Sequence, residues 1–119
     1  MKVIVKITKS FKRQAKPLLK RFSSLKMELV QLEQDLMGNP KLGKYLGHDS
    51  YKIRIVVKSK GKGRSGGLRV ISHIDTEIIG VIEMDGEVTY VNLIAIYDKS
   101  ETSTISDKEL KDLINNLQS

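Results

Sequence analysis

Residues 52–69 hold the side chains best suited to chemistry at a phosphate. This segment carries seven basic residues and no acidic one: Lys52, Arg54, Lys58, Lys60, Lys62, Arg64 and Arg69. Four glycines between residues 58 and 67 expose backbone N–H groups, which together with Lys and Arg side chains can bind phosphate. The glycines do not form a nucleotide-binding loop, because they lack both the Walker spacing and a following helix. Composition alone favours a solvated hairpin tip. The hypothesis that this segment binds the backbone of a nucleic acid therefore needs support from other features of the chain.

The distribution of charge supports a polyanionic partner. The chain has 21 basic and 14 acidic residues, a net charge of +7. Residues 1–69 carry 18 basic and 4 acidic side chains, a net of +14, whereas residues 70–119 carry 3 and 10, a net of −7. The basic part attracts polyanions and gains affinity by counterion release, which favours RNA or DNA. An anionic membrane surface fits less well, because the chain has no Trp and only two Phe.

Length and composition exclude several other classes. A chain of 119 residues predicts a single domain, residues 1–119. The absence of cysteine excludes disulfides, thiolate metal sites and a cysteine nucleophile, and two histidines leave little for a metal centre. We therefore expect no metal and no cofactor. The N-terminal residues lack an apolar signal segment, so we expect a cytoplasmic protein that does not enter a membrane.

The first part of the chain predicts a strand and a helix. Residues 2–7 alternate and are rich in β-branched side chains, which is typical of a short strand. Ser10 is a suitable N-cap for a helix whose apolar side chains recur at helical spacing as far as Phe22. Pro17 lies within this pattern and would either kink the helix or mark its true start.

A second helix and a strand with a basic face follow. Ser23 or Ser24 would cap the helix, which is rich in leucine and ends before Pro40. Residues 51–58 then alternate as a strand. The face opposite its apolar side chains consists of Lys52, Arg54, Val56 and Lys58.

The last part predicts two strands and a terminal helix. Residues 68–81 and 88–97 are strands by composition, joined by a turn at Asp85-Gly86. Ser106 and Glu109 form a capping box at the start of the helix. The order of elements predicts an α+β domain: a small, mostly antiparallel twisted sheet with an N-terminal helical hairpin and a C-terminal helix.

The basic segment lies within a longer stretch that resembles a toxin family. Its most specific unit is Ser65-Gly-Gly-Leu-Arg-Val, within the run from Tyr51 to Ile71. Further similarity covers residues 91–101 and Ile105-Ser-Asp-Lys-Glu-Leu. Over nearly its whole length, the chain resembles the RelE/HigB branch of the RelE/ParE toxin superfamily. The resemblance implies a RelE-like fold and a ribosome-dependent endoribonuclease that cuts mRNA in the ribosomal A site without a metal. It also implies a cognate antitoxin protein that holds the toxin inactive.

Cleavage by 2′-hydroxyl attack needs a base, a cation for the phosphorane and an acid for the 5′-oxygen. Arg69 matches the family's arginine and is assigned to phosphate stabilisation, because arginine cannot act as a base. Lys60 or Lys62 could supply a neutral amine, since crowded positive charge disfavours protonated lysine. Tyr97 and Lys99 match the family's Tyr-x-Lys: Tyr97 would orient or activate the hydroxyl, unless it is simply a core aromatic, and Lys99 would neutralise charge or protonate the leaving oxygen. The predicted RNA-binding residues are Arg54, Lys58, Arg64, Lys12 and Arg13.

We expect the histidines and the carboxylates to have structural rather than catalytic roles. His73 shares a strand face with Arg69 but lies about 13 Å along an extended strand, too far for both to hold one phosphate. We expect it to be packed or at the rim. Relatives carry an aromatic residue at Ser72 or His73, so base stacking at that position is not predicted here. The carboxylates between residues 75 and 87 alternate along strands and suit solvated edges better than a metal site.

Two alternatives remain open. The ParE branch of the same superfamily poisons DNA gyrase without nuclease chemistry, although the segment from Lys60 to Arg69 and Tyr97 argue against it. A non-catalytic nucleic-acid-binding module would use Lys and Arg only for salt-dependent affinity. The charge asymmetry also predicts an acidic inhibitor: an antitoxin could lay an acidic segment over the basic residues or a helix against the sheet.

Overall fold

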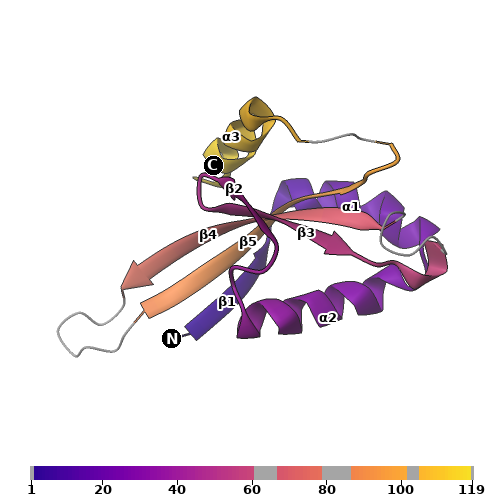
Figure 1. The fold of residues 1–119 in the computed structure, drawn as a ribbon, viewed down its shortest axis with the longest axis horizontal. Helices are drawn as coiled ribbons and strands as arrows, with labels where there is room; N and C mark the ends of the chain where they lie inside the picture. Colours follow the sequence, from indigo (N-terminus) through magenta and orange to yellow (C-terminus); the bar gives the residue numbers. More distant parts are fainter. Residues whose placement is uncertain (1, 61–66, 79–86, 102–104, 119) are drawn as a thin grey trace.

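The computed structural model describes residues 2–60, 67–78, 87–101 and 105–118 of the chain. These residues form an α+β fold with a five-stranded mixed sheet and three α-helices (Figure 1). The predicted α+β class is therefore confirmed. None of the described helices is long and apolar enough to cross a membrane.

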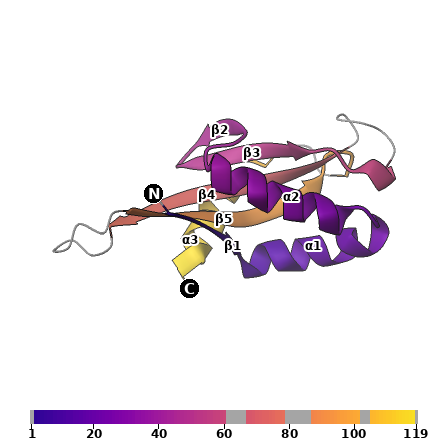
Figure 2. The same ribbon diagram turned by 90° about the horizontal axis from the view of Figure 1, so that it is seen from below.

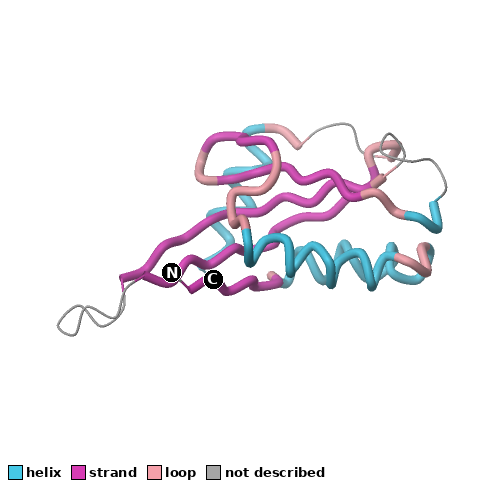
Figure 3. Tube along the Cα trace, turned by 60° about the horizontal axis from the view of Figure 1, so that its bottom comes forward, coloured by secondary structure: helices cyan, strands magenta, loops and turns pink. Residues whose placement is uncertain are grey.

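The strand order in the sheet is β1-β5-β4-β3-β2, so β4 lies between β3 and β5 (Figure 3). The strands are β1 (Lys2–Ile7), β2 (Lys44–Gly47), β3 (Ser50–Ile55), β4 (Leu68–Ile78) and β5 (Glu87–Asp98). β1 pairs with β5 in parallel, and the other three pairs are antiparallel. This order brings the basic strand β3 beside β4, which carries Arg69.

Helix α1 (Lys9–Arg21) begins earlier than the sequence suggests. Its N-cap is Thr8, whose Oγ1 accepts a hydrogen bond from the Phe11 N–H at 3.3 Å, so the prediction of Ser10 is wrong. The hydroxyl of Ser10 instead donates to the Ile94 carbonyl at 2.7 Å, which fixes the helix to β5. Pro17 lies inside the helix, which continues through it.

Helices α2 (Leu25–Gly38) and α3 (Asp107–Asn115) follow their sequence signals closely. Ser24 is the N-cap residue of α2, which follows α1 through a short turn (Figure 2), but its side chain makes no capping hydrogen bond and donates to Glu28 Oε1 instead. At α3 the capping box is confirmed: Ser106 Oγ accepts from the Glu109 N–H at 3.1 Å, and Glu109 Oε1 accepts from the Ser106 N–H at 3.2 Å.

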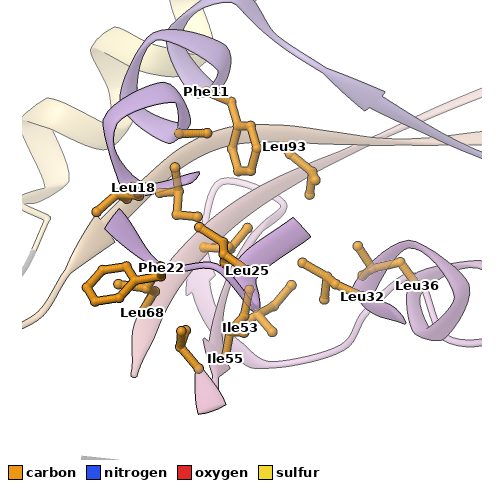
Figure 4. Close-up of a cluster of buried hydrophobic side chains, with 14 of the residues drawn as sticks. Phe11, Leu18, Phe22, Leu25, Leu32, Leu36, Ile53, Ile55, Leu68 and Leu93 are labelled. Atoms are coloured by element: carbon orange, nitrogen blue, oxygen red, sulfur yellow. The ribbon is translucent and has the colours of Figure 1, made fainter. Parts of the chain in front are cut away.

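The core consists of two apolar clusters, one on each face of the sheet. Helices α1 and α2 pack their buried residues, among them Phe11, Leu25 and Leu36, against the first face (Figure 4). Helix α3 packs Leu110 against Ile71, Ile94 and Ala95 on the second face. Burial of each Phe, Leu or Ile side chain among them stabilises the fold by about 1.5–3 kcal/mol.

Two strand predictions need correction. β3 ends at Ile55 rather than at residue 58, and Lys58–Lys60 form a 3₁₀ turn. The chain turns here because Val57 is buried, at 1% exposure, and the backbone N–H of Lys58 donates to Glu28 at 2.8 Å. β2 was not predicted at all, because it is a four-residue edge strand. The predicted turn at Asp85-Gly86 lies outside the described residues.

Candidate nucleic-acid interface

Three strands bring Arg54, Arg69 and Tyr97 into one transverse row. Arg69 on β4 lies opposite Arg54 on β3 and opposite Tyr97 on β5. Residues directly opposite one another in neighbouring strands share a face, and neighbouring strands are about 4.8 Å apart. The row therefore gathers two guanidinium groups and a phenol on the face that also carries α3.

A bulge in β5 puts Tyr97 on that face. Ile71 lies opposite Ala95, whereas Ser72 lies opposite Leu93, so Ile94 is an extra residue in β5. Ile94 and Ala95 consequently both belong to the second cluster, while Leu93 belongs to the first. If β5 alternated regularly through Ile94 instead of forming a bulge there, Tyr97 would point to the same face as Leu93 and away from Arg69.

The row is exposed at one end and covered at its centre. Arg54 is exposed, Tyr97 is half-buried, and Arg69 is only 2% exposed. One guanidinium nitrogen of Arg69, Nη1, donates to the Leu68 carbonyl at 3.3 Å. A phosphate can therefore contact Arg54 directly, whereas it can contact Arg69 only after the groups that cover Arg69 move.

Lys52 lies next to this row and is the lysine that the surrounding charge affects most clearly. Partial burial lowers the pKa of Lys52, and the positive charges of four neighbours lower it further. We define the basic face as Lys52 together with these neighbours, Lys44, Arg54, Arg69 and Lys99. Sequence analysis did not single out Lys52 as a site residue, although its alternation with Arg54 placed both on one face.

A cleft of about 360 Å³ borders the basic face at the β2–β3 edge. Lys44, Lys52 and Arg54 line it together with Leu42, Gly43 and Ile53. Gly43 has a φ of +104°, and a Cβ there would lie 2.5 Å from the Lys52 carbonyl oxygen. Only glycine fits this position without strain, so Gly43 helps to hold the backbone that carries Lys52.

The environment of Tyr97 favours a neutral phenol. Burial raises the pKa of Tyr97, and the negative charge of Glu109 raises it as well. A hydrogen bond with the backbone of Ile105 and the charge of Arg69 act in the opposite direction but do not cancel this rise. At neutral pH the hydroxyl is therefore a hydrogen-bond donor rather than a phenolate base.

The other predicted catalytic residues are not part of the transverse row. Lys60 belongs to the 3₁₀ turn, and its amine lies 3.3 Å from the Asp98 carboxylate, with the Lys60 side chain only 11% exposed. Lys99 is exposed and follows the end of β5. Lys62 and the predicted RNA-binding residue Arg64 lie outside the described residues. Lys60 thus faces a carboxylate, whereas the crowding of positive charge occurs around Lys52.

The remaining predicted RNA-binding residues do not join the basic face. Lys58 is exposed in the turn after β3. Lys12 and Arg13 are exposed on α1, whose buried residues pack against the opposite face of the sheet. These positions could contact a long RNA only if it extends beyond the basic face.

The histidines have structural contacts. His73 is buried, as predicted, and its Nδ1 lies 3.9 Å from Asp75 Oδ1. His48 Nε2 lies 3.1 Å from Asp107 Oδ1, which connects the β2–β3 turn to the first turn of α3. The described residues include no group of three or more His, Asp or Glu side chains that could hold a metal.

Comparison with known proteins gives no assignment: no protein-family model matches the chain, and no curated protein matches it.

Proposed function

We propose that this chain is a toxin of the RelE/HigB type with a RelE-like fold. In this proposal it is a cytoplasmic, metal-independent endoribonuclease that cuts mRNA in the ribosomal A site and is held inactive by an antitoxin protein. The observation that carries the proposal is the row of Arg54, Arg69 and Tyr97 with Lys52 beside it. The row combines cations for a phosphate, a phenol donor and an amine with a lowered pKa, which are the groups that RNA cleavage requires.

The reaction can be written with these groups and Lys99. The Lys52 amine takes the proton of the 2′-hydroxyl, and the 2′-oxygen forms a bond to the phosphorus. Arg54 stabilises the negative charge of the phosphorane directly, Arg69 does so once the groups that cover it have moved, and Tyr97 donates a hydrogen bond to the phosphorane. The bond from phosphorus to the 5′-oxygen then breaks, and Lys99 supplies the proton to that oxygen. The products are a 2′,3′-cyclic phosphate and a 5′-hydroxyl.

We assign the base to Lys52 because its pKa is lowered by burial and by neighbouring cations. Lys60, one of the two lysines that the sequence suggested as a base, has the Asp98 carboxylate 3.3 Å from its amine instead. Lys62 remains an alternative base that lies outside the described residues.

Induced expression in bacteria tests the proposal. Wild-type protein should arrest growth and produce new mRNA 5′ ends within translated reading frames. Arg54→Ala, which removes an exposed guanidinium of the row, should reduce both effects, and Lys26→Ala on the exposed surface of α2 should leave them unchanged. Arrest without mRNA cuts would contradict the nuclease and favour the gyrase poison of the ParE branch.

The burial of Arg69 supports a second candidate, a nucleic-acid-binding module without activity. At 2% exposure, Arg69 cannot contact a phosphate without rearrangement, whereas exposed Arg54 can bind one directly. In such a module, Arg54→Ala would weaken RNA binding and reduce its salt dependence, and neither arrest nor cleavage would occur.

A further inference from the structure

The ion pair between Lys60 and Asp98 lies on the reverse side of the proposed site. Lys60 Nζ is 3.3 Å from Asp98 Oδ2, and the two side chains are 11% and 1% exposed. The contact is an ion pair without the alignment of a hydrogen bond. The Lys60 amine also lies 5.9 Å from the centre of the Phe22 ring, within the first apolar cluster.

Asp98 is held firmly by its other neighbours. Its Oδ1 accepts hydrogen bonds from the backbone N–H of Ser100 at 2.9 Å and from the Ser100 hydroxyl at 2.8 Å. Arg21 Nη2 lies 3.6 Å from Oδ2. Burial by itself would raise the pKa of Asp98, but the hydrogen bonds from Ser100 and the Lys60 ammonium outweigh it and lower the pKa.

A second set of contacts fixes the backbone of the same turn. The N–H of Ser59 donates to Ser24 Oγ at 2.9 Å, and the N–H of Lys58 donates to Glu28 Oε2 at 2.8 Å. Ser24 Oγ in turn donates to Glu28 Oε1 at 3.0 Å. The start of α2 therefore holds the turn, and Lys60 reaches from this fixed point to the end of β5.

The sheet register shows what the ion pair connects. Ile55, Leu68 and Asp98 form the row next to Arg54, Arg69 and Tyr97. Asp98 directly follows Tyr97 in β5, so its side chain points to the opposite face of the sheet. The ion pair thus links the 3₁₀ turn after β3 to the end of β5 on the face of the sheet opposite the proposed site.

We propose that Lys60 and Asp98 are a positioning pair: they set the spacing of the strands that carry Arg54, Arg69 and Tyr97, and neither contacts the RNA. This inference rests on the proposed function for its catalytic consequence. In this inference the Lys60 ammonium pairs with the Asp98 carboxylate, and it neither takes the proton of the 2′-hydroxyl nor binds a phosphate. It also identifies Asp98, which sequence analysis did not single out, as a residue that affects the site indirectly.

Lys60→Arg separates this role from that of a base, because arginine can pair with a carboxylate but cannot accept the proton. The measurement is the steady-state rate of mRNA cleavage on programmed ribosomes at several substrate concentrations, which gives kcat and KM. The kcat of Lys60→Arg should stay within about threefold of the wild-type value. Lys60→Ala should lower kcat about tenfold or more with little change in KM, and Lys26→Ala is the matched control. Equal losses in Lys60→Arg and Lys60→Ala would overturn the proposal in favour of a base. A raised KM with unchanged kcat in Lys60→Ala would overturn it in favour of RNA binding.

A double-mutant cycle tests the pair independently of activity. Lys60→Ala, Asp98→Asn and the double variant are compared by urea unfolding, and Lys60→Arg, which can keep the pair, is compared with Lys60→Ala if Asp98→Asn fails to fold. The double variant should have a free energy of unfolding no lower than that of the less stable single variant, because each single variant already breaks the pair. Additive losses in the free energy of unfolding would contradict the proposed ion pair, even if the wild type cleaves mRNA. Non-additive losses in a protein that does not cleave mRNA would support the pair and reject the nuclease.

Discussion

Arg69 lies directly opposite Tyr97 in the β4–β5 ladder, with Arg54 on its other side in β3. Arg69 is thus the shared neighbour of an exposed guanidinium and a half-buried phenol. Its positive charge lowers the pKa of both Tyr97 and Lys52, although burial is the largest influence on each. The titration of these two residues therefore reports on the arrangement of the site.

Arg69→Gln should raise the pKa of Tyr97 above its already raised value, because it removes a positive charge that favours the phenolate. The measurement is a pH titration of the Tyr97 ring by NMR. Arg13→Gln on α1 is the control and should leave the titration unchanged. A Tyr97 titration that is identical in Arg69→Gln and wild type would show that the two side chains do not face each other.

Lys52→Gln should abolish most mRNA cleavage while making the fold more stable. The folded-state pKa of Lys52 lies below its unfolded value, so at neutral pH the charged amine costs stability, and stability rises as pH increases through the folded pKa. Thermal unfolding at neutral pH should show a melting temperature a few degrees above that of the wild type. The rise of stability with alkaline pH should also be smaller in the variant.

The cleavage rate should depend on the same ionisation. With Lys52 as the base, single-turnover rates should increase with pH and level off at a pKa below that of an ordinary lysine. Lys52→Arg keeps the charge and should remain inactive across the pH range. An unchanged pH profile in Lys52→Arg would move the base to another residue.

Asp98→Asn should make the protein less sensitive to acid. The folded-state pKa of Asp98 is lowered, so its contribution to stability is present above its unfolded pKa and is lost as pH falls through the folded value. Urea unfolding from neutral pH to below about pH 4 should show a smaller loss for the variant than for the wild type. Parallel losses in both proteins would show that the pKa of Asp98 is not lowered in solution.

Gly43→Ala should destabilise the β2–β3 edge. A Cβ at this position would lie 2.5 Å from the Lys52 carbonyl oxygen, in a backbone with a φ of +104°. We expect a loss of about 2 kcal/mol or more in the free energy of unfolding, measured with urea. Gly38→Ala is the control, because a Cβ there meets no atom within 4 Å.

Features that depend on neighbouring residues were predictable from the sequence. The capping box of Ser106 and Glu109 involves residues three apart, and its spacing is a local signal. The α+β class followed from periodicity in the same way. The edge strand β2 escaped prediction because it has four residues, and its pairing with β3 is what makes it a strand.

The arrangement of the site was only partly predictable. Arg54, Arg69, Tyr97 and Lys99 were identified from residue types and from the resemblance, but the row of Arg54, Arg69 and Tyr97 depends on strand register. The bulge at Ile94 could not be predicted, because it lies in an unbroken apolar run from Leu93 to Ile96 that leaves the alternation ambiguous. The pairing of Lys60 with Asp98 is a tertiary contact, for which the sequence offers no spacing signal.

The most direct test of the proposed nuclease is a purified translation system with mRNA positioned in the ribosomal A site and no added metal beyond what the ribosome needs. Wild-type protein should cut the mRNA and leave a 2′,3′-cyclic phosphate, and Lys52→Gln and Arg54→Ala should slow the cut by about a hundredfold or more. Lys26→Ala should cut at the wild-type rate. Intact mRNA after incubation with folded wild-type protein, or equal cutting by all four proteins, would contradict the proposal.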